Sequence, residues 1–148
     1  RTAVGPALPA DLRALLQGHT PRLALGQALA GVAHAALDLS DGLTGDLGHI
    51  LTASGVGADI ALADLPVAPA LSTLPDAERQ TCLLAGGDDY ELLFTAPVSA
   101  RDAVRAAALA SGTAVTRIGT VSATSGLRLL GAAGTAVALS AKSFDHFG

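Results

Sequence analysis

The chain has 148 residues, half of them apolar but only 3% aromatic, and a formal net charge of −4. This length suits one domain with a substantial core, and because the charges are scattered without a Lys/Arg cluster we expect no nucleic-acid partner. Mean hydropathy is positive, but the most apolar stretch, residues 23–37, contains Gln27 and His34 and is shorter than the ~20 apolar residues of a membrane span, so we expect no membrane partner.

Apolar spacing and the positions of Gly and Pro predict an alternation of helices and strands. In chain order we expect helices at 9–17 and 22–30, a buried strand at 32–39, a helix at 43–54 ended by Gly55, a strand at 58–62, a proline-marked connection at 66–75, a helix at 76–84, a strand at 90–95, a helix at 101–110 ended by Gly112, and strands at 115–121, 127–130 and 137–139. Because strands cluster late, this order predicts an α+β fold, a mixed-sheet sandwich with helices packed on the sheet. No Gly-x-Gly-x-x-Gly joins a strand to a helix, so the usual dinucleotide motif is absent.

The cysteine and methionine contents bear on redox state and on completeness. Cys82 is the only cysteine, which excludes an internal disulfide and is consistent with a reducing compartment. Its apolar neighbours are typical of the buried face of a helix, so we expect an inert core thiol. The sequence contains no methionine, which favours a piece of a longer chain.

The segment 38–42 (Asp-Leu-Ser-Asp-Gly) lies where a predicted strand meets a predicted helix. Alternation along a strand puts Asp38 and Ser40 on the face opposite to Leu39. Helix amino ends attract phosphate, and Mg²⁺ held by the two Asp carboxylates would neutralise a phosphate to which Ser40 donates. The alternative is that Ser40 or Asp41 only caps the helix. A cap alone does not explain Asp38, because burying this carboxylate without a partner would be costly, so the alternative is a cap together with a solvated Asp38.

A second acidic segment, residues 86–94 (Gly-Gly-Asp-Asp-Tyr-Glu-Leu-Leu-Phe), precedes and enters a predicted strand. Its two glycines permit a close approach of the backbone to another group. Asp88, Asp89 and Glu91 then surround the only tyrosine of the chain, an arrangement that suits a cationic or hydroxyl-bearing ligand. A hairpin or bulge with solvated acidic side chains explains the pattern equally well.

A third segment, residues 144–147 (Phe-Asp-His-Phe), is rich in aromatic side chains. It either anchors the end of the chain to the core or forms an aromatic wall for a flat ligand. His19, His34, His49 and His146 are far apart in the sequence and show no ligand spacing, so we expect structural or surface histidines and no zinc site.

Together these segments resemble the thiamine-monophosphate kinase family, specifically its C-terminal domain. The similarity extends over nearly the whole chain, and its motifs occur in the family's order and spacing. The segments that carry it are Pro21–Gly26, Ala36–Leu43, Asp46–Ile50, Gly86–Phe94, Thr116–Gly119 and Phe144–Phe147. The resemblance implies a cytoplasmic enzyme that transfers the γ-phosphoryl group of ATP to thiamine monophosphate, giving thiamine diphosphate by direct in-line transfer.

The resemblance also implies roles for particular residues. Asp38 and Asp41 would be Mg²⁺ ligands, and Ser40 would contact a phosphate of ATP. Asp88 and Phe144 stand where the family has its acidic and aromatic substrate contacts. The family usually has Glu at the position of Asp88, and the shorter Asp side chain would need a bridging water to reach the substrate.

The same resemblance predicts that residues 1–148 form the C-terminal domain of a two-domain kinase. The family's N-terminal domain supplies most of the ATP and metal site and the homodimer interface, and nothing in this sequence corresponds to it. We therefore expect the chain alone to fold but to be inactive. The remaining alternatives are another member of the superfamily of aminoimidazole ribonucleotide synthetase, such as a selenophosphate synthetase, and a non-catalytic binding module.

Overall fold

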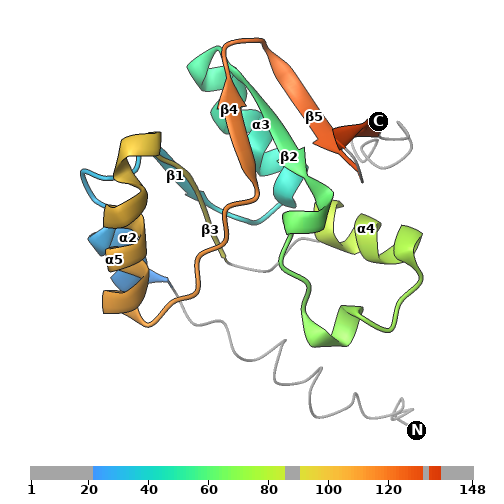
Figure 1. Ribbon diagram of the computed structural model, residues 1–148, viewed down its shortest axis with the longest axis horizontal. Coiled ribbons are helices and arrows are strands. Elements are labelled where there is room, and N and C mark those ends of the chain that lie inside the picture. Colours follow the sequence, from blue (N-terminus) through green and yellow to red (C-terminus); the bar gives the residue numbers. More distant parts are fainter. Residues whose placement is uncertain (1–21, 86–90, 132–133, 138–148) are drawn as a thin grey trace, which may run out of the picture.

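The computed structural model describes residues 22–85, 91–131 and 134–137 of the chain (Figure 1). The helices are α2 (Leu23–Ala28), α3 (Leu43–Ser54), α4 (Asp76–Ala85) and α5 (Arg101–Ser111). The strands are β1 (Ala35–Asp38), β2 (Gly57–Ala61), β3 (Leu92–Thr95), β4 (Gly119–Ser122), β5 (Gly126–Leu130) and β6 (Ala136–Val137). Short 3₁₀ turns occupy Leu62–Asp64, Pro69–Leu71 and Val98–Ala100.

The strands form two separate sheets. The larger has the order β4-β2-β5-β6, in which β2 runs parallel to β5 and antiparallel to β4. The smaller is an antiparallel ribbon of β1 and β3, in which Asp38 pairs with Leu92. Mixed strand directions with packed helices confirm the predicted α+β class.

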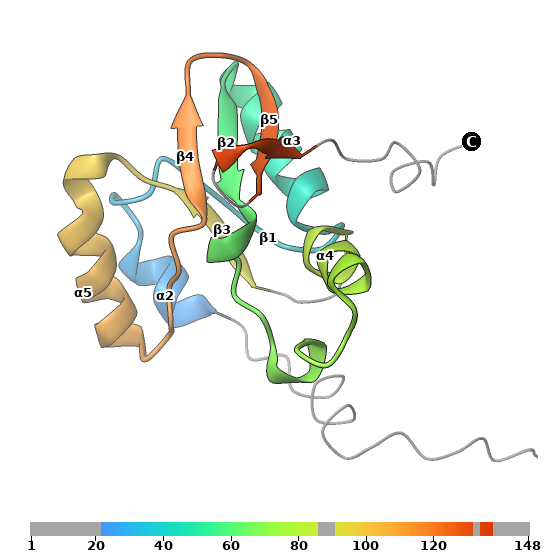
Figure 2. The same cartoon turned by 45° about the vertical axis from the view of Figure 1, so that its right-hand side comes forward.

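Helix α3 lies at the centre of the main core. Its buried side chains Leu47, Ile50 and Leu51 belong to one cluster with Ile60 of β2 and with β5 and β3 residues. Figures 1 and 2 show α3 beside the larger sheet, and Ala35 and Leu37 of β1 also pack against this core cluster. The helix therefore packs against residues of both sheets.

A second, smaller core lies on the other side of the β1–β3 ribbon. Leu25 and Leu29 near α2 and Ala107 of α5 form it, and Leu92 and Phe94 of β3 pack against it. The two helices lie side by side in both ribbon views. Because side chains alternate along a strand, β3 contributes Leu92 and Phe94 to this core and the residue between them to the main core.

The sequence placed the helices within the described residues well, but it misjudged burial, and the helix expected at 9–17 lies outside the described residues. The strand expected at 32–39 is shorter and alternates between half-buried and exposed side chains, because only β3 pairs with it. His34 is exposed. Cys82 is also exposed rather than buried, since it lies two residues before the buried Leu84, and residues two apart point to nearly opposite sides of a helix. The strand expected at 115–121 begins only at Gly119.

Within the described part of the chain, no helix is long and apolar enough to cross a membrane.

Candidate functional site

The turn between β1 and α3 exposes the polar side chains that the sequence singled out. Asp38, Ser40 and Asp41 are all exposed, whereas Leu37 and Leu39 pack against the main core. The alternation predicted for this segment is therefore confirmed. Asp38 is solvated, as the capping alternative expected, so the cost of burying its carboxylate does not arise.

The backbone of this turn is held by three successive amides. The amide of Leu39 donates to the carbonyl oxygen of Glu91 at 2.8 Å. The amides of Ser40 and Asp41 both donate to Oδ2 of Asp46, at 2.8 and 3.0 Å. Asp46 is only 4% exposed. The turn thus combines a fixed backbone with side chains that are free to meet a ligand.

The alternative that Ser40 or Asp41 caps α3 is wrong. The N-cap residue is Gly42, and no side chain caps it by a hydrogen bond. Gly42 has φ 95° and ψ 156°, a conformation that is essentially restricted to glycine. A Cβ on Gly42 would lie 2.9 Å from Cα of Ala85, so the close approach of α4 also requires glycine here.

Helix α4 ends directly against the start of α3. The Thr44 hydroxyl donates to the carbonyl oxygen of Leu84 at 3.0 Å in a buried position. Ala85 lies against Gly42, and the carbonyl oxygen of Glu91 accepts from the amide of Leu39. Both described residues that flank segment 86–90 therefore lie beside the turn. Asp88 itself, and Phe144, lie outside the described residues.

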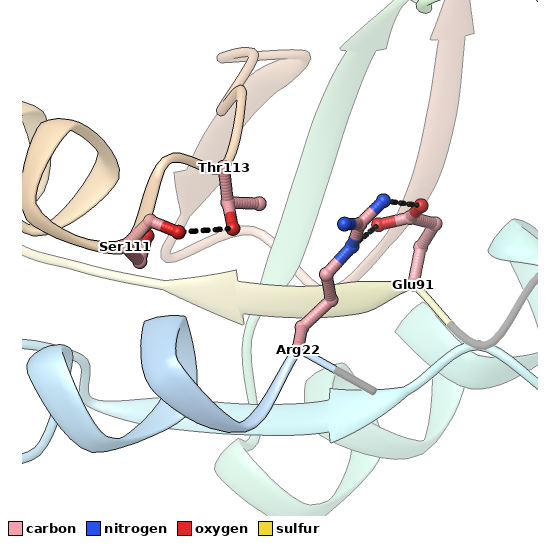
Figure 3. Close-up of polar contacts among 4 residues, drawn as sticks. All are labelled: Arg22, Glu91, Ser111 and Thr113. Atoms are coloured by element: carbon pink, nitrogen blue, oxygen red, sulfur yellow. Dashed lines mark hydrogen bonds and ion pairs between the residues drawn. The ribbon is translucent and has the colours of Figure 1, made fainter. Parts of the chain in front are cut away.

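An ion pair fixes the entry to β3. The Arg22 guanidinium donates from Nε to Glu91 Oε2 at 3.0 Å and from Nη2 to Oε1 at 2.6 Å (Figure 3). The hydrogen bond to Glu91 raises the pKa of Arg22 above its ordinary value. Figure 3 shows the arginine reaching from the start of α2 across to the start of β3. This ion pair links the start of α2 to Glu91, the residue whose carbonyl oxygen accepts from the amide of Leu39.

A pocket of about 380 Å³ lies between α2 and the ends of β1 and β3. Asp38 lines it together with the Arg22–Glu91 pair. The remaining lining residues are Leu23, Gly26, Gln27 and Leu92. The pocket therefore offers an exposed carboxylate, a cation already neutralised by its partner, and an apolar floor.

A candidate metal-binding group lies at the start of α3. One ligand atom from each of Asp41, Asp46 and His49 falls within 4.8 Å of the other two. Carboxylate oxygens suit Mg²⁺, and the Asp41 carboxylate is exposed while the Asp46 Oδ2 already accepts two amides. The exposed carboxylate of Asp41 thus suits a hard cation, whereas Asp46 is already engaged by the two amides and an imidazole does not favour such an ion.

The sequence reasoning missed Asp46 and His49 as neighbours of Asp41. A spacing of three residues places Asp46 and His49 on one face of a helix, and this signal was present in the sequence. Asp38, the other carboxylate expected to bind metal, is not a member of this group and lines the pocket instead.

Comparisons with known proteins agree on one relationship. The family model described as AIR synthase related protein, C-terminal domain, matches residues 13–131. Thiamine-monophosphate kinase of Salmonella typhimurium is 43% identical over 142 residues, which cover 93% of this chain and 43% of that protein.

Solved structures show the same similarity. Thiamine-monophosphate kinase from Stenotrophomonas maltophilia aligns with a TM-score of 0.76 at 42% identity, over 86% of this chain and 40% of that chain. A structure described as AaThiL complexed with AMPPCP and TMP aligns with a TM-score of 0.67 at 28% identity, over 84% of this chain and 40% of that one. The chain thus spans less than half the length of the relatives it matches.

Proposed function

The chain belongs to the AIR synthase related protein family, whose C-terminal domain it matches over residues 13–131, and from this premise we propose that it is the C-terminal domain of a two-domain thiamine-monophosphate kinase. The whole enzyme transfers the γ-phosphoryl group of ATP to thiamine monophosphate in the cytoplasm. The observation that carries this proposal is the hydrogen-bonded turn that exposes Asp38, Ser40 and Asp41. The 43% identity to the Salmonella kinase supports the same assignment.

The exposed side chains of the turn would serve the nucleotide. Asp38 and Asp41 hold Mg²⁺, and the Ser40 hydroxyl donates to a phosphate oxygen of ATP. Bound Mg²⁺ supplies charge neutralisation at the phosphates, which is the main requirement of phosphoryl transfer besides in-line positioning. The fixed amides of the turn support this role, because a ligand then finds the side chains already oriented.

Substrate binding is assigned to the neighbouring segments. Asp88 and Phe144 position thiamine monophosphate. The described residues on either side of segment 86–90, Ala85 and Glu91, both contact the turn, which supports this assignment for Asp88. We assign direct transfer without a phosphoenzyme, because no base among the described residues is hydrogen-bonded to the hydroxyl of Ser40. The similarity to a structure that holds AMPPCP, an ATP analogue, and TMP supports the choice of substrates.

The rest of the site belongs to the N-terminal domain of the whole kinase. That domain supplies further metal and nucleotide contacts and the homodimer interface, so residues 1–148 alone fold but do not turn over substrate. The chain's coverage of 43% of the Salmonella kinase supports this division.

The test uses the full-length protein, ATP, Mg²⁺ and thiamine monophosphate. We expect thiamine diphosphate to form, Asp41→Asn to raise the Mg²⁺ requirement, and Ser40→Ala to slow turnover by no more than one lost hydrogen bond allows, about 10–100-fold. Asp102→Asn on α5 is the matched control, because that carboxylate is 95% exposed and pairs only with the next turn of its helix. Intact metal dependence and turnover in Asp41→Asn, or phosphoserine in the wild type, would contradict the proposal.

A further inference from the structure

We propose that Asp46 is a positioning residue that sets the geometry of the nucleotide site by holding the amides of Ser40 and Asp41. This inference rests on the proposed function, because it concerns the same turn. Its basis is the hydrogen bonding of one oxygen: Oδ2 of the buried Asp46 accepts from both amides, at 2.8 and 3.0 Å.

The direction of these bonds distinguishes Asp46 from an ordinary helix-capping residue. A capping side chain lies before the helix and accepts from amides inside its first turn. Asp46 does the reverse, since it lies inside α3 and reaches back past the N-cap Gly42 to amides that precede the helix. Its carboxylate therefore fixes the loop rather than the end of the helix.

Fixing these amides determines where two functional side chains point. The backbone torsions at Ser40 and Asp41 set the directions of their Cβ atoms, and both side chains are exposed. On the other side of the turn, the carbonyl of Glu91 holds the amide of Leu39. Without Asp46 the amides of Ser40 and Asp41 would lose their acceptor, and a metal ion or phosphate would have to order these two residues on binding.

Asp46 could act in two ways, and three substitutions distinguish them. Its oxygen could matter through its position, as an acceptor for the amides, or through its charge, as a further negative group near Asp41 and His49. Asp46→Asn keeps an oxygen at nearly the same place and removes the charge. Asp46→Glu keeps the charge and moves the oxygen by one methylene, and Asp46→Ala removes both.

The experiment measures two quantities in the full-length kinase with these variants and the Asp102→Asn control. The first is hydrogen exchange of the Ser40 and Asp41 amides without metal. The second is the affinity for Mn²⁺, used as a probe for the Mg²⁺ site. We expect protected amides and a loss of affinity of about threefold in Asp46→Asn, since an uncharged acceptor bonds less strongly. In Asp46→Glu or Asp46→Ala, whichever folds, we expect faster hydrogen exchange of the two amides and a loss of Mn²⁺ affinity of about 10–100-fold.

Two results would overturn the proposal. One is an Asp46→Asn variant with protected amides that loses as much Mn²⁺ affinity as the other variants, because charge would then be the cause. The other is unchanged amide exchange in Asp46→Glu and Asp46→Ala. If the wild-type protein makes no thiamine diphosphate, the proposed function fails, while amide exchange in the metal-free protein still decides whether Asp46 holds the turn.

Discussion

Replacing Gly42 by alanine tests the reason why this turn and helix α4 lie so close together. The new Cβ would be 2.9 Å from Cα of Ala85, 3.0 Å from its carbonyl carbon and 3.1 Å from the carbonyl oxygen of Leu84. All of these atoms belong to the backbone, so no flexible side chain can move aside. The alanine must also adopt φ 95° and ψ 156°, a region that residues with a side chain avoid.

The expected loss in the free energy of unfolding has two parts. The backbone conformation costs of order 1–3 kcal/mol, and inserting a methyl group into a packed site costs typically another 1–3 kcal/mol. We therefore expect Gly42→Ala to destabilise the protein by about 4 kcal/mol, a large share of the roughly 5–15 kcal/mol of a typical domain.

Urea unfolding of the variant and of two glycine controls measures this effect. Gly55 has φ 64° and ends the same helix, but a Cβ there meets no atom within 4 Å, so Gly55→Ala reports the cost of the backbone alone, about 1–2 kcal/mol. Gly48 lies inside α3 with no atom near its Cβ position, so Gly48→Ala should stabilise by about 0.5–1 kcal/mol. If Gly42→Ala costs no more than Gly55→Ala, the close approach of α4 does not require glycine at position 42.

Three other contacts give further predictions, each read from chemical unfolding. Thr44→Val keeps the shape of the side chain but leaves the buried carbonyl of the α4 end without its donor, and should cost about 1–3 kcal/mol. Glu91→Gln weakens a half-exposed ion pair and should cost no more than about 1 kcal/mol at low salt. That difference should disappear at about 1 M salt, where charges are screened within about 3 Å. A hydrogen bond from Arg128 lowers the pKa of Asp59 below its ordinary 3.8, so the stability from this pair is complete above that pH and is lost as the pH falls through the lower folded-state pKa. Asp59→Asn should therefore flatten the acid side of the stability profile, and an unchanged profile would contradict this.

The elements of the fold were largely predictable because they depend on local patterns. The apolar spacing within 43–54 and the glycines that follow α3 and α5 predicted these helices to within a residue, and both glycines adopt the left-handed conformation that ends a helix. The strands were less predictable. The segment 32–39 is apolar enough for a buried strand, but burial depends on how many neighbours pair with it, and local sequence does not specify that number.

The candidate site was predictable in its exposed side chains but not in its support. Asp38, Ser40 and Asp41 stood out because polar residues interrupt an apolar pattern. Asp46 did not, since an acidic residue near the start of a helix is common and usually solvated. Its importance follows from burial and from the amides it binds, which only the folded chain shows.

The hydrogen bonds of the turn also limit how it can bind phosphate. Many helix amino ends hold anions through free backbone amides, and the sequence suggested the same here. In the structure, the amides of Leu39, Ser40 and Asp41 are already bound to Glu91 and Asp46, so they cannot also donate to a ligand. What the turn presents instead is two carboxylates and one hydroxyl. Carboxylates repel phosphate unless a cation lies between them, so phosphate binding by these side chains requires the metal.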